Sequence, residues 1–146
     1  MFTDCYCTQF RRSARALTRI YDAALKEHGI RLTQFSLLRA LDRLGAATVQ
    51  ELSDEVVLDK TTMSRNVKVL SAAGWLTKVE TDDLREKRVR LSPAGKKKLA
   101  QSTESWRVAQ MQILESAKNV FSSAADDPLI ETLEKLQALS AASDAP

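Results

Sequence analysis

The chain has 146 residues, of which 44% are apolar and 28% are charged, and its formal net charge is +3. This length suits one domain with an appended element, and the composition is that of an ordinary soluble globular protein. One His and two Cys exclude a four-ligand zinc site or a disulfide framework within one chain. No apolar run is long enough to cross a membrane. We therefore expect a cytoplasmic protein that binds no membrane.

The positive charge is concentrated in one part of the sequence. Residues 59–98 carry 11 basic and 5 acidic side chains, whereas residues 99–146 carry 3 basic and 7 acidic ones. A basic block in a nearly neutral chain suggests a polyanionic partner. A solvated basic face without a partner is the alternative, and composition does not decide between the two.

The first part of the chain predicts two helices. Apolar residues at alternating spacings of four and three, beginning at Phe10 and including Tyr21, predict a helix over residues 7–26 that ends at Gly29. Thr33 is the expected N-cap of a second helix, which ends at Gly45.

A helix-turn-helix pattern follows. The segment Thr48-Val49-Gln50-Glu51 is a capping box that opens a short helix. After a three-residue turn, Asp59 caps a helix over residues 60–73 with Met63, Val67 and Leu70 facing inward, and Gly74 ends it.

The remaining sequence predicts a hairpin and two more helices. Residues 75–80 and 87–91 read as two strands joined by a charged loop. Ser92-Pro93 opens a long helix to about residue 122, and Asp126-Asp127-Pro128 starts the last one. The fold class is therefore mainly α with a small β-hairpin wing, that is, a winged helix-turn-helix with additional helices.

In such a unit the second helix enters the DNA major groove, so its exposed face carries the expected contacts. Arg can donate two hydrogen bonds to guanine, hydroxyl groups bond bases or phosphates, and Lys neutralises phosphate. An Arg on the hairpin suits the minor groove of A·T-rich DNA, and Asp83 is expected to hold the Arg85 guanidinium in place. The candidate DNA-binding residues are Lys60, Thr61, Thr62, Ser64, Arg65 and Lys68 on the helix, and Asp83, Arg85, Lys87 and Arg88 on the wing.

Several segments resemble the MarR family of bacterial transcription regulators. Leu32-Thr33-Gln34-Phe35-Ser36-Leu37-Leu38 is similar to the opening of the family's second helix, and Glu51-Leu52-Ser53 to its ELA segment. The longest similarity is in the wing, where residues 83–95 are similar to the family pattern DxRxxRxxxLTxxG, with one position fewer before Leu91 and Ser92 in place of the Thr.

The resemblance implies a dimeric repressor that binds a pseudo-palindromic operator and is released by a small ligand or an oxidant. It implies a helical dimerisation region of residues 1–31 and 93–146, and a winged helix-turn-helix DNA-binding region of residues 32–92. The apolar stripes of the outer helices agree with this, because they need a partner to cover them.

The two cysteines, Cys5 and Cys7, support three hypotheses. They can be inert small residues, a redox site in which Cys7 is the thiol that is oxidised and Cys5 can condense with it, or ligands of a soft metal such as Cu(I). For the redox hypothesis, Cys7 followed fourteen residues later by Tyr21 is similar to the first helix of the family's organic-hydroperoxide repressors. In those repressors the Tyr comes from the other subunit and bonds the oxidised sulfur. A second Tyr of their site corresponds to Arg11 here.

We expect no enzyme and no cofactor. One His and four Gly leave no Ser-His-Asp set and no glycine-rich phosphate loop. The alternatives to a DNA-binding regulator are a winged-helix module that binds protein, and a thiol peroxidase that uses Cys7. His28 is interpreted as a polar residue near a helix end, and Trp106 as a core or interface residue.

Overall fold

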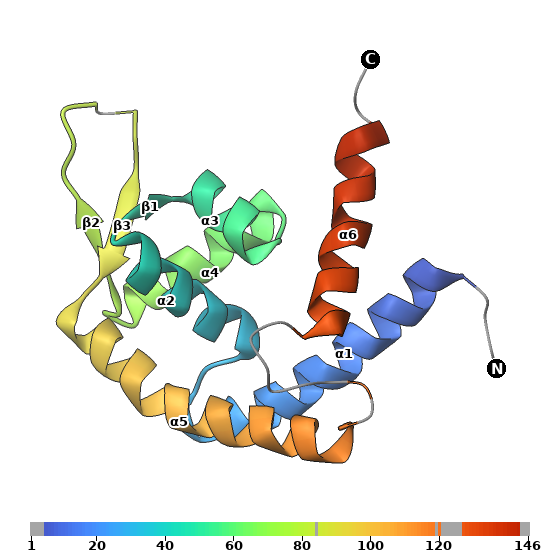
Figure 1. The fold of residues 1–146 in the computed structure, drawn as a ribbon. Helices are drawn as coiled ribbons and strands as arrows, with labels where there is room; N and C mark the ends of the chain where they lie inside the picture. Colours follow the sequence, from blue (N-terminus) through green and yellow to red (C-terminus); the bar gives the residue numbers. More distant parts are fainter. Residues whose placement is uncertain (1–4, 84, 119, 121–126, 144–146) are drawn as a thin grey trace. The chain divides into compact units, whose positions relative to one another are not determined.

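The computed structural model describes residues 5–83, 85–118, 120 and 127–143. By contact the chain forms two units, Met1–Arg107 and Val108–Pro146. The elements follow one another in the predicted order (Figure 1). The predicted dimerisation region, residues 1–31 and 93–146, and the predicted DNA-binding region, residues 32–92, are defined by their roles in a dimer on DNA. Their boundaries therefore stay a prediction.

The first unit begins with α1 (Tyr6–Leu25), which is followed by a short 3-10 helix, η1 (Lys26–His28). Gly29 closes this segment as predicted, with φ +69° and an N–H bond to the Lys26 carbonyl of 3.0 Å. Next comes α2 (Leu32–Leu44), which starts one residue before the predicted cap. Thr33 is therefore not the N-cap. Instead, the Asp22 carboxylate of α1 accepts from the Leu32 N–H at 2.7 Å.

The helix-turn-helix forms as predicted, except that its second helix ends one residue before the predicted residue 73. It consists of α3 (Val49–Val56) and α4 (Lys60–Ala72). The capping box forms, since Thr48 accepts from the Glu51 N–H and Glu51 accepts from the Thr48 N–H. At the end of α4, Gly74 has φ +79° and the Trp75 N–H bonds the Leu70 carbonyl at 3.0 Å, which is a Schellman motif.

The wing has one strand more than the sequence predicted. β2 (Leu76–Val79) and β3 (Arg88–Leu91) pair antiparallel with Leu76 opposite Leu91, as expected for the hairpin. A two-residue strand, β1 (Ala47–Thr48), pairs with the other edge of β3, so the order is β1-β3-β2. Because β1 is so short and runs directly into the α3 capping box, its residues carry no alternation from which a strand could be predicted.

The last two helices are α5 (Pro93–Ser116) and α6 (Pro128–Ser143). Ser92 caps α5 as predicted, because its Oγ accepts from the Gly95 N–H at 3.0 Å. The predicted end of α5 near residue 122 is wrong, since the helix ends at Ser116; residues 121 and 122 lie outside the described residues. The Leu129 N–H bonds the Asp127 carboxylate at the start of α6, while Asp126 is not described.

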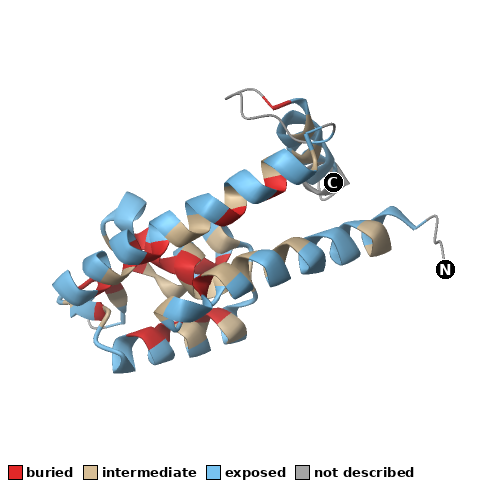
Figure 2. Ribbon diagram, turned by 90° about the horizontal axis from the view of Figure 1, so that it is seen from below, coloured by how far each residue is buried: buried red, intermediate tan, exposed pale blue. Residues whose placement is uncertain are grey.

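The core of the first unit lies where α2, α3 and α4 meet the sheet and the start of α5. Figure 2 shows the buried residues gathered there, whereas α1 is mostly exposed. Met63, Val67 and Leu70 of α4 are buried, as predicted. The largest fully buried side chains are Phe35, Leu25, Leu37, Leu38, Leu41, Leu52, Met63 and Leu70. This packing fixes α4 and the wing relative to one another, because both contribute to the same core.

Candidate nucleic-acid interface

The turn between α3 and α4 sets how α4 is presented. Val57 ends α3 in the left-handed region with φ +58°, and the Leu58 N–H bonds the Ser53 carbonyl at 3.1 Å. Asp59 then caps α4 by accepting from the Thr62 N–H at 2.8 Å. Its carboxylate has a lowered pKa, first because of the Thr62 hydroxyl, which donates to it at 2.5 Å, and then because of the Thr62 N–H.

One face of α4 is polar and exposed. Lys60, Thr61, Arg65 and Lys68 are exposed, and Ser64 is half-buried. They lie away from the buried stripe that begins at Met63. Thr62 was predicted in the same set, but its hydroxyl is bonded to Asp59, so the structure gives it a capping role. The face offers a guanidinium, two ammonium groups and two hydroxyls.

The loop between the wing strands is held by local hydrogen bonds. The Asp83 carboxylate accepts from the backbone N–H of Arg85 at 2.9 Å, and Thr81 Oγ1 donates to the Asp83 carbonyl at 2.8 Å. The prediction that Asp83 holds the Arg85 guanidinium is therefore corrected. Asp83 shapes the turn, as Asp side chains do in Asx-turns, and the exposed Arg85 side chain projects from that turn.

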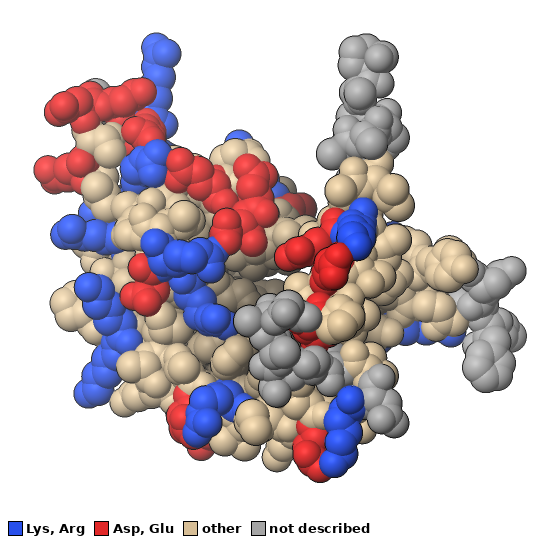
Figure 3. Space-filling model, in the orientation of Figure 1, with Lys and Arg blue, Asp and Glu red and all other residues tan. Residues whose placement is uncertain are grey.

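The wing loop carries charges of both signs. Besides Arg85 and Lys87 it contains four acidic residues, namely Glu80, Asp82, Asp83 and Glu86. Figure 3 shows acidic side chains gathered at the end of the wing, with a basic side chain extending beyond them. A basic side chain on this loop must therefore be long to contact a polyanion, because a shorter one would bring the carboxylates of the loop close to the polyanion as well.

Arg88 has a different position from the one predicted. It lies on β3, where its guanidinium donates to both carboxylate oxygens of Glu51 at 2.9 and 3.0 Å and to Glu86 at 2.6 Å. These bonds, to Glu51 first, raise the pKa of Arg88, and they help the Thr48 N–H to lower the pKa of Glu51. Arg88 thus joins the wing to the capping box of α3 and is not aimed at solvent.

Sequence reasoning missed this connection between Arg88 and Glu51. It identified Glu51 as a capping-box residue, but the partner depends on β1, which places Thr48 opposite Arg88. A glutamate in a capping box bonds the N-cap N–H through one carboxylate oxygen and can still accept hydrogen bonds through the other. That second oxygen is the only signal in the sequence for an arginine partner.

An aromatic cluster lies within the first unit. Trp106 stacks on Tyr21 with ring centroids 6.2 Å apart and on Phe35 at 5.8 Å, and the Arg39 guanidinium lies 4.6 Å from its centroid. Trp106 packs against the hydrophobic core. Burial raises the pKa of Tyr21. His28, near Trp106, bonds Ser105 Oγ at 2.8 Å through Nε2, which joins η1 to α5.

Neither Cys5 nor Cys7 forms a disulfide, and both are exposed at the start of α1. Cys5 is the N-cap residue, and the pKa of its thiol is lowered by hydrogen bonds from the Thr8 side chain and backbone, with a smaller contribution from Arg11. Tyr21 lies on the same helix, and fourteen residues of α-helix separate it from Cys7 by about 21 Å along the axis. Within one chain the two residues are therefore far apart, and only a Tyr21 from a second copy can approach Cys7.

Among the described residues, no helix is both long and apolar enough to span a bilayer. Likewise, within that part of the chain, no group of three His, Cys, Asp or Glu side chains comes together as a metal site.

Comparison with known proteins places this architecture among transcription regulators. A sequence profile of the MarR family matches residues 28–85, from η1 to the wing. The chain is 30% identical over 90 residues to an uncharacterised HTH-type transcriptional regulator, YwoH, of Bacillus subtilis. That match covers 62% of this chain and 66% of YwoH, so it spans slightly less than two thirds of that protein.

Solved structures extend the likeness over nearly the whole chain. The Mycobacterium tuberculosis transcriptional regulator MosR, crystallised in complex with DNA, is 29% identical with a TM-score of 0.79, covering 97% of this chain and 100% of MosR. A mutant of Escherichia coli MarR crystallised with operator DNA has the same fold, with a TM-score of 0.72 at 23% identity over 91% of each chain. These relatives are transcriptional regulators and not enzymes. The chain described here is a winged-helix protein that is similar, in sequence and in fold, to the MarR family of transcriptional regulators.

Proposed function

We propose that this chain is a homodimeric repressor that binds a pseudo-palindromic DNA operator through α4 and the wing. The observation that carries the proposal is the face of α4 that begins at Lys60 and includes Arg65 and Lys68. It is polar and exposed, while the opposite face is fixed in the core. MosR and the MarR mutant, which have this fold, were crystallised with DNA. A chromosomal target also fits the cytoplasmic location expected from the sequence.

The DNA contacts that we propose are fewer than the DNA-binding residues predicted from the sequence. In our assignment Arg65 and Thr61 reach base edges in the major groove, and Lys60 and Lys68 contact phosphates. Arg85 enters the minor groove from the Asp83 turn, and Lys87 supports it. Thr62, Asp83 and Arg88 are assigned to positioning, because each is bonded within the protein.

The dimer is proposed from apolar side chains that a single chain leaves exposed. On α1, Tyr6, Phe10 and Ile20 are 82%, 46% and 42% exposed. On α6, Ile130 and Leu139 are 50% and 65% exposed. Apolar residues gathered on the outer helices are typical of a subunit interface. Sedimentation equilibrium should give a dimer mass, and Phe10→Glu should give a monomer. Leu44→Glu, at a 44% exposed position outside these helices, is the matched control and should stay dimeric.

We further propose that oxidation of the N-terminal cysteines releases the protein from DNA. The sequence hypothesis assigned the reaction to Cys7, but we propose Cys5 as the attacking thiol, because hydrogen bonds from Thr8 lower its pKa. The Cys5 thiolate attacks an organic hydroperoxide, which gives the Cys5 sulfenic acid and an alcohol. The Cys7 thiol then displaces water to form the disulfide. A disulfide between residues two apart is strained, so its formation would distort the first turn of α1.

The test is fluorescence anisotropy of labelled DNA from upstream of the chain's own gene. Reduced protein should bind, stoichiometric hydroperoxide should abolish binding, and reductant should restore it. Cys5→Ser should bind DNA normally and ignore the oxidant. Binding that is indifferent to oxidation would leave inert cysteines and release by a small ligand. An absence of DNA binding with a steady turnover of peroxide would support the thiol peroxidase, and an absence of both would support a protein-binding module.

A further inference from the structure

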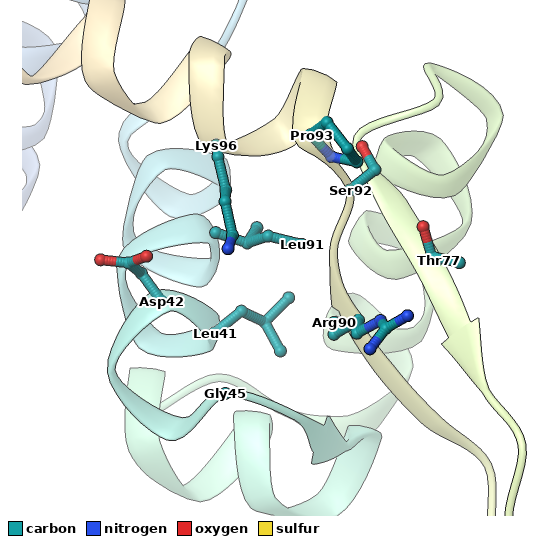
Figure 4. Close-up of a pocket in the computed structure, with 9 residues that line it drawn as sticks. All are labelled: Leu41, Asp42, Gly45, Thr77, Arg90, Leu91, Ser92, Pro93 and Lys96. Atoms are coloured by element: carbon teal, nitrogen blue, oxygen red, sulfur yellow. The ribbon is translucent and has the colours of Figure 1, made fainter.

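A pocket of about 640 Å³ lies within the first unit, away from α4 and the end of the wing. It opens between the end of α2, the bases of β2 and β3, and the start of α5 (Figure 4). This volume is within the range of sites for small molecules. The lining residues are Leu41, Asp42, Gly45, Thr77, Arg90, Leu91, Ser92, Pro93 and Lys96.

The pocket brings together two cations and a hydroxyl. Thr77 and Arg90 are directly opposite one another in the β2–β3 register, so their side chains share one face of the sheet. Lys96 extends into the space between Arg90 and Asp42 from the first turn of α5, as Figure 4 shows. The helix start adds partial positive charge on the same side.

These polar groups are unused by the protein. In the part of the chain that the structure describes, the side chains of Thr77, Arg90 and Lys96 make no hydrogen bond or ion pair. Arg88, two residues before Arg90 on the same strand, contrasts with this, because its guanidinium bonds two carboxylates. Asp42, on the α2 side of the pocket, is the one acidic lining residue, so the lining carries a net charge of +1.

The remaining wall is aliphatic. Leu41 and Leu91 are 1% and 6% exposed and form the floor where the pocket meets the core, and Pro93 adds a third apolar surface. None of the lining residues is aromatic. An occupant that matches these walls has a flexible aliphatic body and one anionic end.

We propose that this pocket binds a medium-chain aliphatic carboxylate. The carboxylate pairs with the Arg90 guanidinium and the Lys96 ammonium and accepts from Thr77, and the chain covers Leu41, Leu91 and Pro93. Binding does not depend on the proposed DNA-binding function. An effect of the bound ligand on DNA binding follows from its position, because the ligand contacts both the base of the wing and α5, which meet at Ser92.

The test is calorimetric titration of the full-length protein with octanoate, with octan-1-ol as the uncharged analogue. We expect saturable binding of one octanoate per chain, weakened about tenfold or more in Arg90→Gln and in Lys96→Gln. Lys97→Gln removes the same charge from the next position of α5, which does not line the pocket, and should leave the affinity within about twofold. All three positions are exposed, so melting temperatures close to that of the unchanged protein will verify folding.

Three outcomes overturn the proposal. They are no octanoate binding, equal binding of octan-1-ol, and an affinity that is unchanged in Arg90→Gln. If octanoate does not bind but Arg90→Gln lowers DNA affinity and the slope of its salt dependence, the pocket cations contact a DNA phosphate. Failure of DNA binding with octanoate binding intact would refute the proposed function alone.

Discussion

Gly95 is the position at which one added methyl group should damage the connection between α4 and the wing. An ideal β-carbon at Gly95 would lie 2.0 Å from the Trp75 carbonyl oxygen, 3.0 Å from its carbonyl carbon and 3.3 Å from its α-carbon. Unstrained contacts between such atoms are well over an ångström longer than the shortest of these distances. Gly95→Ala therefore requires the backbone itself to move.

That backbone is tied on both sides. The Trp75 carbonyl accepts from the Ser92 N–H at 3.0 Å, and the Trp75 N–H completes the Schellman motif of α4. Ser92 Oγ also donates to the Gly74 carbonyl at 2.6 Å. Overpacking lowers stability by about 1–3 kcal/mol. We expect a loss near the upper end of this range at Gly95, because the atoms that must move belong to the backbone. The better helix propensity of Ala returns about 0.5–1 kcal/mol, so we expect a net loss of about 2 kcal/mol.

Urea denaturation followed by circular dichroism measures this loss as a lower midpoint at unchanged slope. Thermal unfolding should shift down by roughly 4–8 °C, at about 2–4 °C per kcal/mol for a chain of this size. Ala94→Gly is the matched control, since it removes a β-carbon from the exposed preceding position and should cost less than about 1 kcal/mol. A Gly95→Ala protein as stable as the original would refute the close approach of α5 to Trp75.

Four further predictions concern the turn, the thiols, the cap and the wing. Val57→Gly should stabilise the fold by about 1 kcal/mol in urea denaturation, because it relieves a left-handed β-branched residue that is 86% exposed; destabilisation would contradict the assigned backbone. The rate at which Cys5 reacts with iodoacetamide should rise with pH around a midpoint below the ordinary thiol pKa. Thr8→Val should raise that midpoint, since the Thr8 side chain is the first cause of the lowered pKa. Equal pH–rate curves for the two proteins would exclude Thr8 as the cause. The folded-state pKa of Glu51 is lowered, so its contribution to stability is present above its ordinary pKa and is lost as the pH falls through the lowered value; acid titration of Glu51→Gln should lack this part of the loss. Arg85→Ala should weaken operator binding by about 1–3 kcal/mol in fluorescence anisotropy, and an unchanged affinity would exclude Arg85 from the interface.

Local signals in the sequence predicted most of the fold. Capping residues at Thr48, Asp59 and Ser92, together with Gly74, gave the boundaries of α3, α4 and the start of α5, because each acts within a few residues of chain. The N-cap of α2 was misplaced at Thr33 because Asp22, ten residues earlier, bonds the Leu32 N–H. The end of α5 was placed too far along because a seven-residue apolar repeat continues beyond Ser116 in the sequence.

The candidate site was predictable in position but not in detail. The periodicity of Met63, Val67 and Leu70 correctly identified the exposed face of α4. The roles of Arg88 and Asp83 were not predictable, because a charge pattern does not show which cation already has a partner in the fold. Arg88 bonds Glu51, which is 37 residues away in sequence, and only the pairing of β1 with β3 brings them together.

The central claim is that the exposed face of α4 reads DNA, and Arg65→Ala tests it most directly. Anisotropy should be measured over a series of salt concentrations with operator DNA and with unrelated DNA of equal length. We predict that Arg65→Ala loses the preference for the operator, whereas Arg107→Ala, which removes an exposed arginine from α5, retains it. If Arg65→Ala keeps both its operator preference and its affinity, α4 is not the element that recognises DNA.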